Sequence, residues 1–136
     1  MDYKTMKITV EDVRAKNPCY DPTKFVSEDW AGTVIDILKM ENVKPADRLW
    51  ITTRFLDDKT NRLFATWCAR EALKLIENPD PRSIEACNVA EKFANGNATI
   101  EDLNAANATA YAAAYAADAN ARNKQVKKLL EMCLEE

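Results

Sequence analysis

The sequence predicts an all-α protein: a single-domain helical bundle of about six to seven helices with a long alanine-rich C-terminal helix. Three observations support this prediction. The chain has 136 residues, only two glycines and a charged fraction of 30%, which is typical of helices rather than of turn-rich sheet. Capping residues and prolines that mark helix starts recur along its length. Eleven of the seventeen residues from Ala105 to Ala121 are alanine, the best helix former.

We expect one domain over residues 1–136, because a chain of this length can bury a core without disulfides or metals. Short N-terminal helices are expected in residues 1–44 and a three-helix core in residues 45–98. The long C-terminal helix is expected over residues 99–136. The connections between the later helices are short, so these helices should run antiparallel to their neighbours.

Three threonines, each followed three residues later by aspartate, predict capped helix starts: Thr9 with Asp12, Thr33 with Asp36 and Thr99 with Asp102. A short extended piece is expected at residues 7–9, and the helix after it should stop before Pro18. The helix that starts at Thr33 should bury four apolar side chains: Val34, Ile35, Ile37 and Leu38.

Prolines at a first helical position predict three more helix starts, at Pro22, Pro45 and Pro81. The helix at Pro22 is expected to carry Phe25, Val26 and Trp30 and to end at Gly32. The helix at Pro45 is apolar on much of its circumference, which indicates a well-covered position. Gly96 should close the helix that starts at Pro81.

Apolar residues at helical spacing predict the buried faces of two core helices. The first of these helices follows the Asp57-Asp58 loop and should run to about Glu77. Its expected buried residues are Phe64, Trp67, Cys68, Leu75 and Ile76. The expected buried residues of the helix after Pro81 are Ile84, Cys87, Val89, Ala90 and Phe93.

The C-terminal helix carries Tyr111 and Tyr115, which are either interface anchors or inward-facing residues. Their helical phase matches that of Val126, Leu129 and Cys133, so we expect them to face the bundle. The end of this helix should extend beyond its neighbours. Its apolar residues would then be covered by the N-terminal helices or by a second copy of the chain, and a homodimer would use Val126, Leu129, Leu130 and Leu134.

Composition argues against an enzyme and against a cofactor or metal. The chain has no histidine, the commonest general base and metal ligand. The four cysteines are far apart in sequence, without the close pairs of zinc and redox motifs, which indicates free thiols in a reducing compartment. No apolar run is long enough to cross a membrane, so a cytoplasmic protein is expected. The interspersed charges, with a net value of -3, do not favour a nucleic acid partner.

Surface charges supply the candidate residues for binding a protein partner. Short connections should bring the Asp57-Asp58 loop to the same end of the bundle as Glu101 and Asp102, which gives an acidic end that would attract a basic surface. Acids in a first helical turn also simply complement the helix dipole. With two arginines expected on the surface, the candidate set is Asp57, Asp58, Arg70, Arg82, Glu101 and Asp102.

Five stretches stand out: RLFATWCAREA at 62–72, NPDPRS at 78–83, VAEKFANG at 89–96, DRLW at 47–50 and the alanine-rich tail. Together they resemble a family of small immunity proteins that is frequent in phage and prophage genomes. The resemblance is dense between Asp47 and Ala121. Family tails tend to carry tryptophan where this chain has Tyr111 and Tyr115.

This resemblance implies a non-enzymatic, all-helical protein that binds and neutralises a harmful protein. The target would be a toxin or, for an anti-defence protein of a phage, a host defence effector such as a CRISPR effector. The resemblance assigns no binding residue. The alternative hypothesis is a structural or assembly protein that self-associates through its long C-terminal helix.

Overall fold

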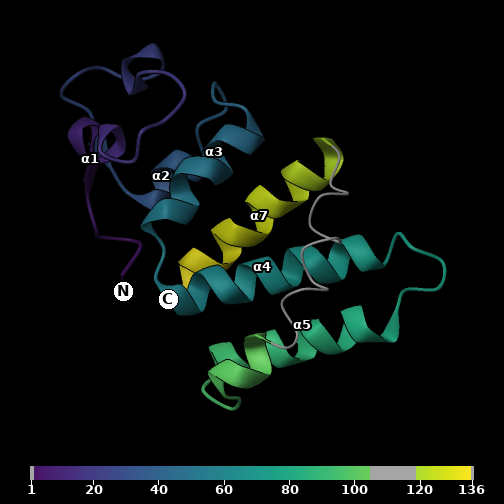
Figure 1. Ribbon diagram of the computed structural model, residues 1–136. Helices are drawn as coiled ribbons and strands as arrows, with labels where there is room; N and C mark the ends of the chain where they lie inside the picture. The colour runs from purple at the N-terminus through teal and green to yellow at the C-terminus, as the bar shows by residue number, and fades with distance from the viewer. Residues whose placement is uncertain (1, 105–118, 136) are drawn as a thin grey trace. The chain divides into compact units, whose positions relative to one another are not determined.

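The computed structural model describes residues 2–104 and 119–135, which are mostly α-helical, as the sequence predicts (Figure 1). The chain divides into two compact units. Unit 1 consists of Met1–Leu56 and Arg122–Glu136, and unit 2 is Asp57–Ala121. The expected helix at Pro45 belongs to unit 1 and the next two helices to unit 2, while the single domain over 1–136 stays a prediction.

The N-terminal part of unit 1 is built on a short antiparallel pairing of β1 (Ile8–Thr9) with β2 (Ala31–Gly32). Ile8 pairs with Gly32 and Thr9 with Ala31. Each strand leads directly into a helix, α1 (Val10–Arg14) after β1 and α2 (Val34–Leu38) after β2. The pairing therefore places the starts of these two helices close together.

Both helices begin with the predicted capping box. The Thr9 hydroxyl accepts a hydrogen bond from the Asp12 amide at 3.2 Å, and the Asp12 carboxylate accepts one from the Thr9 amide at 2.9 Å. Thr33 and Asp36 make the same pair of bonds, at 3.2 and 2.9 Å. All four apolar residues expected to be buried in α2 are buried.

The predicted helix from Pro22 to Gly32 is wrong beyond its first turn. Asp21 caps a single 3-10 turn, η1 (Pro22–Lys24), as its carboxylate accepts a hydrogen bond from the Thr23 amide at 2.9 Å. The chain then leaves the helical conformation, because Gly32 is extended in β2 and pairs with Ile8. A pairing between residues so distant in sequence overrides the local helix signal.

Unit 1 continues with α3 (Pro45–Thr52), a 3-10 turn η2 (Thr53–Phe55) and, from Arg122 on, α7 (Ala119–Glu135). Arg48 on α3 donates hydrogen bonds to the carbonyls of Leu38 and Val43, at 2.8 and 2.9 Å, and so ties α3 to the end of α2. Leu49 and Thr52 are buried on α3. Three residues of α7 supply apolar core, as predicted: Val126, Leu129 and Cys133.

Unit 2 contains a helical hairpin of α4 (Asp58–Leu73) and α5 (Pro81–Ala94), which lie side by side and run antiparallel (Figure 1). Cys87 on α5 is buried together with residues from the last turns of α4: Ala69, Ala72 and Leu73. Gly96 closes α5 as predicted, with a positive φ of 79° and a hydrogen bond from the Asn97 amide to the Lys92 carbonyl.

The predicted buried faces of the hairpin are only partly correct. Phe64 and Cys87 are buried, whereas Trp67, Cys68, Val89, Ala90 and Phe93 are half-buried. Leu75, Ile76 and Ile84 are exposed, so their predicted burial is wrong. α4 ends at Leu73, not near Glu77, and the amides of Leu75 and Ile76 bond three residues back in a tighter turn. This turn takes the two side chains off the buried stripe.

The predicted C-terminal helix is observed at both of its ends. Residues 100–104 are helical after the Thr99–Asp102 capping box, and α7 covers Ala119–Glu135. Residues 105–118 lie outside the described residues, and with them most of the alanine-rich run, Tyr111 and Tyr115. One continuous helix over 99–136 therefore stays a prediction.

Candidate functional site

The four acidic residues expected to bind a partner lie at helix starts in unit 2. The Asp57 carboxylate accepts a hydrogen bond from the Thr60 amide at 2.8 Å and caps α4. Asp102 belongs to the capping box with Thr99, and this hydrogen bonding lowers the pKa of its carboxyl group. Asp58 and Glu101 are exposed beside these caps. Asp57 and Asp102 thus have structural roles at helix starts.

Arg70 is engaged within unit 2. Its guanidinium forms an ion pair with Glu91 on α5 and donates a hydrogen bond to the Asn88 side chain at 3.1 Å. The Arg70 side chain is 38% exposed. It therefore holds the two helices of the hairpin together, which is a structural role that the sequence pattern did not indicate.

Arg82 is the more accessible of the two candidate arginines. Its side chain is 81% exposed and forms an ion pair with Asp80 at 2.8 Å, at the start of α5. This pair lowers the pKa of the Asp80 carboxyl group and raises that of the Arg82 guanidinium. Arg82 lies two residues from Ile84, one of the exposed apolar residues of the hairpin.

The loop end of the hairpin carries an apolar surface that the sequence did not predict. Leu75 is 75% exposed, Ile76 48% and Ile84 44%. We call these three residues the hairpin tip. The buried cluster around Cys87 involves the last turns of α4, and Ile84 lies one turn nearer the loop than Cys87. Ile84 is outside this buried cluster.

Charged residues are close in sequence to the hairpin tip. Lys74, which forms an ion pair with Glu71 at 3.1 Å, precedes Leu75, and Glu77 follows Ile76. Arg82 and Glu85 lie within two residues of Ile84. Unit 2 as a whole has ten acidic and six basic residues, whereas unit 1 has twelve acidic and thirteen basic ones. The net negative charge of the chain thus comes from unit 2, which also bears the hairpin tip.

The described residues contain no group of cysteines and carboxylates able to hold a metal ion. Cys87 is a buried free thiol, and burial raises the pKa of this group, which makes the reactive thiolate scarcer. Over the same part of the chain, no helix is long and apolar enough to span a membrane.

Comparisons of the chain with protein-family models, with curated proteins and with solved structures found no match. The immunity-protein resemblance therefore stays a prediction. The surface features of unit 2 that bear on its function are the hairpin tip, the charged residues near it and the two arginines.

Proposed function

We propose that this chain is a non-enzymatic inhibitor of the immunity-protein or phage anti-defence type, which neutralises one protein target by stoichiometric binding. The target is a toxin or a host defence effector. The hairpin tip is the observation that supports this proposal most. Leu75 is three-quarters exposed and Ile76 and Ile84 are nearly half exposed at the loop end of the hairpin, and exposed apolar side chains that gather in one region are typical of protein interfaces.

The excess of acidic residues in unit 2 indicates the chemistry of the target. Apolar side chains that reach into a groove supply affinity at the centre of an interface, and charges around them set the encounter rate and the choice of partner. The best match is a target with an apolar groove and a basic rim. Arg82 lies beside the tip and would pair with an acidic group of that rim.

Self-association through α7 has less support. Two of the four residues expected at a homodimer interface, Val126 and Leu129, are buried, which leaves the half-buried Leu130 and the exposed Leu134. A dimer with so small an apolar contact would be weak. Light scattering after size exclusion separates the two proposals, because a monomer at tens of micromolar is expected for the inhibitor.

A direct test uses the tagged full-length chain as bait for a panel of purified bacterial toxins and defence effectors. The expected result is a 1:1 complex in which the activity of the target is lost at equimolar inhibitor. A saturating screen without a partner would reject the proposal.

Two matched variants then test the surface. Leu75→Glu places a charge in the hairpin tip and should weaken binding by about tenfold or more. Leu134→Glu makes the same change at an exposed residue of α7 and should leave the affinity unchanged. Equal effects of the two variants would mean that the tip is not the binding surface. Circular dichroism of both variants checks that each is folded.

A further inference from the structure

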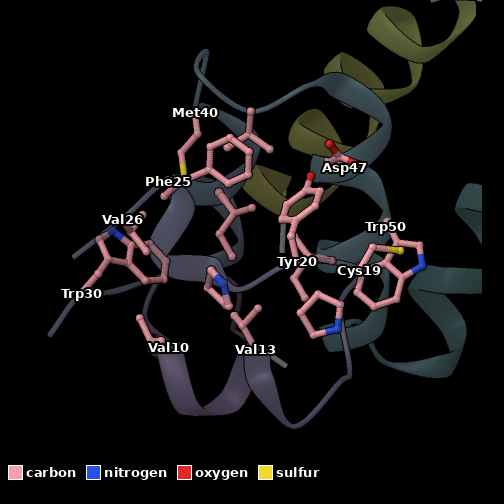
Figure 2. Close-up of a pocket in the computed structure, with 15 residues that line it drawn as sticks. Val10, Val13, Cys19, Tyr20, Phe25, Val26, Trp30, Met40, Asp47 and Trp50 are labelled. Atoms are coloured by element: carbon pink, nitrogen blue, oxygen red, sulfur yellow. The ribbon is translucent and has the colours of Figure 1, made fainter. Parts of the chain in front are cut away.

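Unit 1 contains an apolar cavity of about 140 Å³. Side chains from α1, η1 and the loop after it, α2 and α3 surround it. Figure 2 shows the Tyr20 ring between Phe25 on one side and Trp50 on the other, with its hydroxyl group directed at Asp47. Trp30 and several aliphatic side chains, Val10, Val13 and Val26 among them, complete the lining.

Two polar groups of this lining, the Tyr20 hydroxyl and the Asp47 carboxylate, face each other (Figure 2). Burial, with a further contribution from Asp47, raises the pKa of Tyr20 to about 12, so the phenol is uncharged over the usual pH range. Most of the lining is apolar, so an uncharged ligand suits the cavity better than an ion.

The size of the cavity sets the size of the ligand. A buried cavity of about 150 Å³ with leucine, isoleucine and phenylalanine walls stays dry and binds benzene. The cavity in unit 1 has nearly this volume but is partly open to solvent, and four of its side chains are aromatic: Tyr20, Phe25, Trp30 and Trp50. Aromatic rings offer edge-to-face and stacked contacts to a ring placed among them.

We propose that the cavity in unit 1 binds one small uncharged aromatic molecule of about the size of toluene. This proposal is independent of the proposed function, because the cavity lies in unit 1 and the hairpin tip in unit 2. Cys19 provides a built-in reporter. It lines the cavity, and it alone is exposed among the four cysteines.

The test titrates the full-length chain with toluene and follows two properties. The rate at which iodoacetamide alkylates Cys19, measured by mass spectrometry of its peptide, should fall severalfold and saturate. The Tm should rise by about 3 °C once toluene exceeds its Kd severalfold. Benzylamine has a similar ring but is charged at neutral pH and should do neither. Absence of saturable protection by toluene, or equal protection by benzylamine, would overturn the proposal.

A cavity-filling variant locates the site. Val26→Phe fills the space from a half-buried lining position, so toluene should no longer protect Cys19, while the Tm should be kept or raised. Val89→Phe makes the same change at a half-buried residue of α5 in unit 2 and should leave protection intact. Unchanged protection in a folded Val26→Phe variant would contradict this site. If that variant does not fold, the toluene and benzylamine titrations of the original chain decide the proposal.

Discussion

Arg70 on α4 and Glu91 on α5 form an ion pair across the helical hairpin of unit 2. The same guanidinium donates a hydrogen bond to Asn88, so one side chain of α4 holds two residues of α5. A residue that sequence alone placed among candidate contacts to a partner thus connects two helices of its own chain. Substitutions can distinguish the structural role of Arg70 from a role in binding a partner.

Arg70→Ala should lower the free energy of unfolding by no more than about 1 kcal/mol, because both members of the pair are more than a third exposed and solvent screens them. A double-mutant cycle with Glu91→Gln, measured by urea denaturation, should give a coupling energy of about 0.5 kcal/mol. A coupling near zero, together with loss of target binding in Arg70→Ala, would instead place Arg70 at the interface.

Leu73→Ala and Leu75→Ala should differ strongly although they are two residues apart. Leu73 is buried against Cys87, and its truncation should cost about 2 to 5 kcal/mol. Leu75 is mostly exposed, and its truncation should change stability by less than about 0.5 kcal/mol. Urea denaturation of both variants checks this. A similar loss in the two would show that Leu75 is covered, and the hairpin tip would not exist as an open surface.

Gly96→Ala should destabilise the chain by about 1 to 2 kcal/mol, because Gly96 ends α5 with a φ of 79°. An added Cβ would meet no atom within 4 Å, so this cost comes from the backbone alone. Gly96→Asn is the matched control, since asparagine adopts the left-handed conformation more readily, and it should cost less. Thermal unfolding ranks the two variants, and an equal loss in both would contradict the backbone explanation.

Stability should fall in acid partly through Arg14. This arginine forms ion pairs with Asp21, at 3.0 Å, and with Glu28, and it lowers the pKa of both carboxyl groups below their ordinary values of 3.8 and 4.5. A carboxyl group with a lowered pKa stabilises the folded state above its ordinary pKa. This stabilisation is lost as the pH falls from about 4.5 toward the lowered values.

Arg14→Gln removes these two ion pairs and a third one, with Glu11 at 3.2 Å, so the difference in Tm between this variant and the original chain measures their combined contribution. The difference should be largest above about pH 5 and should shrink as the pH falls to about 2. The other carboxylates titrate in both proteins and cancel in the comparison. A difference in Tm that stays constant over this range would mean that the pairs do not contribute.

The helix starts could be predicted because they depend on a few neighbouring residues. Thr9, Thr33 and Thr99 each bond to an aspartate three residues later, and this geometry needs nothing from the rest of the chain. The helix expected after Pro22 failed for the opposite reason. Gly32 pairs with Ile8 from a distant part of the sequence, and no local pattern around Gly32 indicates that partner.

The candidate site was harder to predict than the fold. The helical spacing of Leu75 and Ile84 indicated a buried face, but Leu75 lies beyond the end of α4, and both side chains are exposed. The aromatic cavity joins Tyr20, Trp30 and Trp50 from separate elements, so no short motif indicates it. The excess of acidic residues in unit 2 was visible in the sequence once the boundaries of the unit were known.

The division of the chain into units also sets an order in which they can be completed on the ribosome. Unit 2 is one uninterrupted stretch, Asp57–Ala121, whereas unit 1 needs α7, which is translated after unit 2. The hairpin of α4 and α5 can therefore form before Val126 and Leu129, two buried residues of unit 1, have emerged. Until then, unit 1 lacks the apolar residues that α7 contributes to its core, and its incomplete core is open to chaperones and to neighbouring nascent chains.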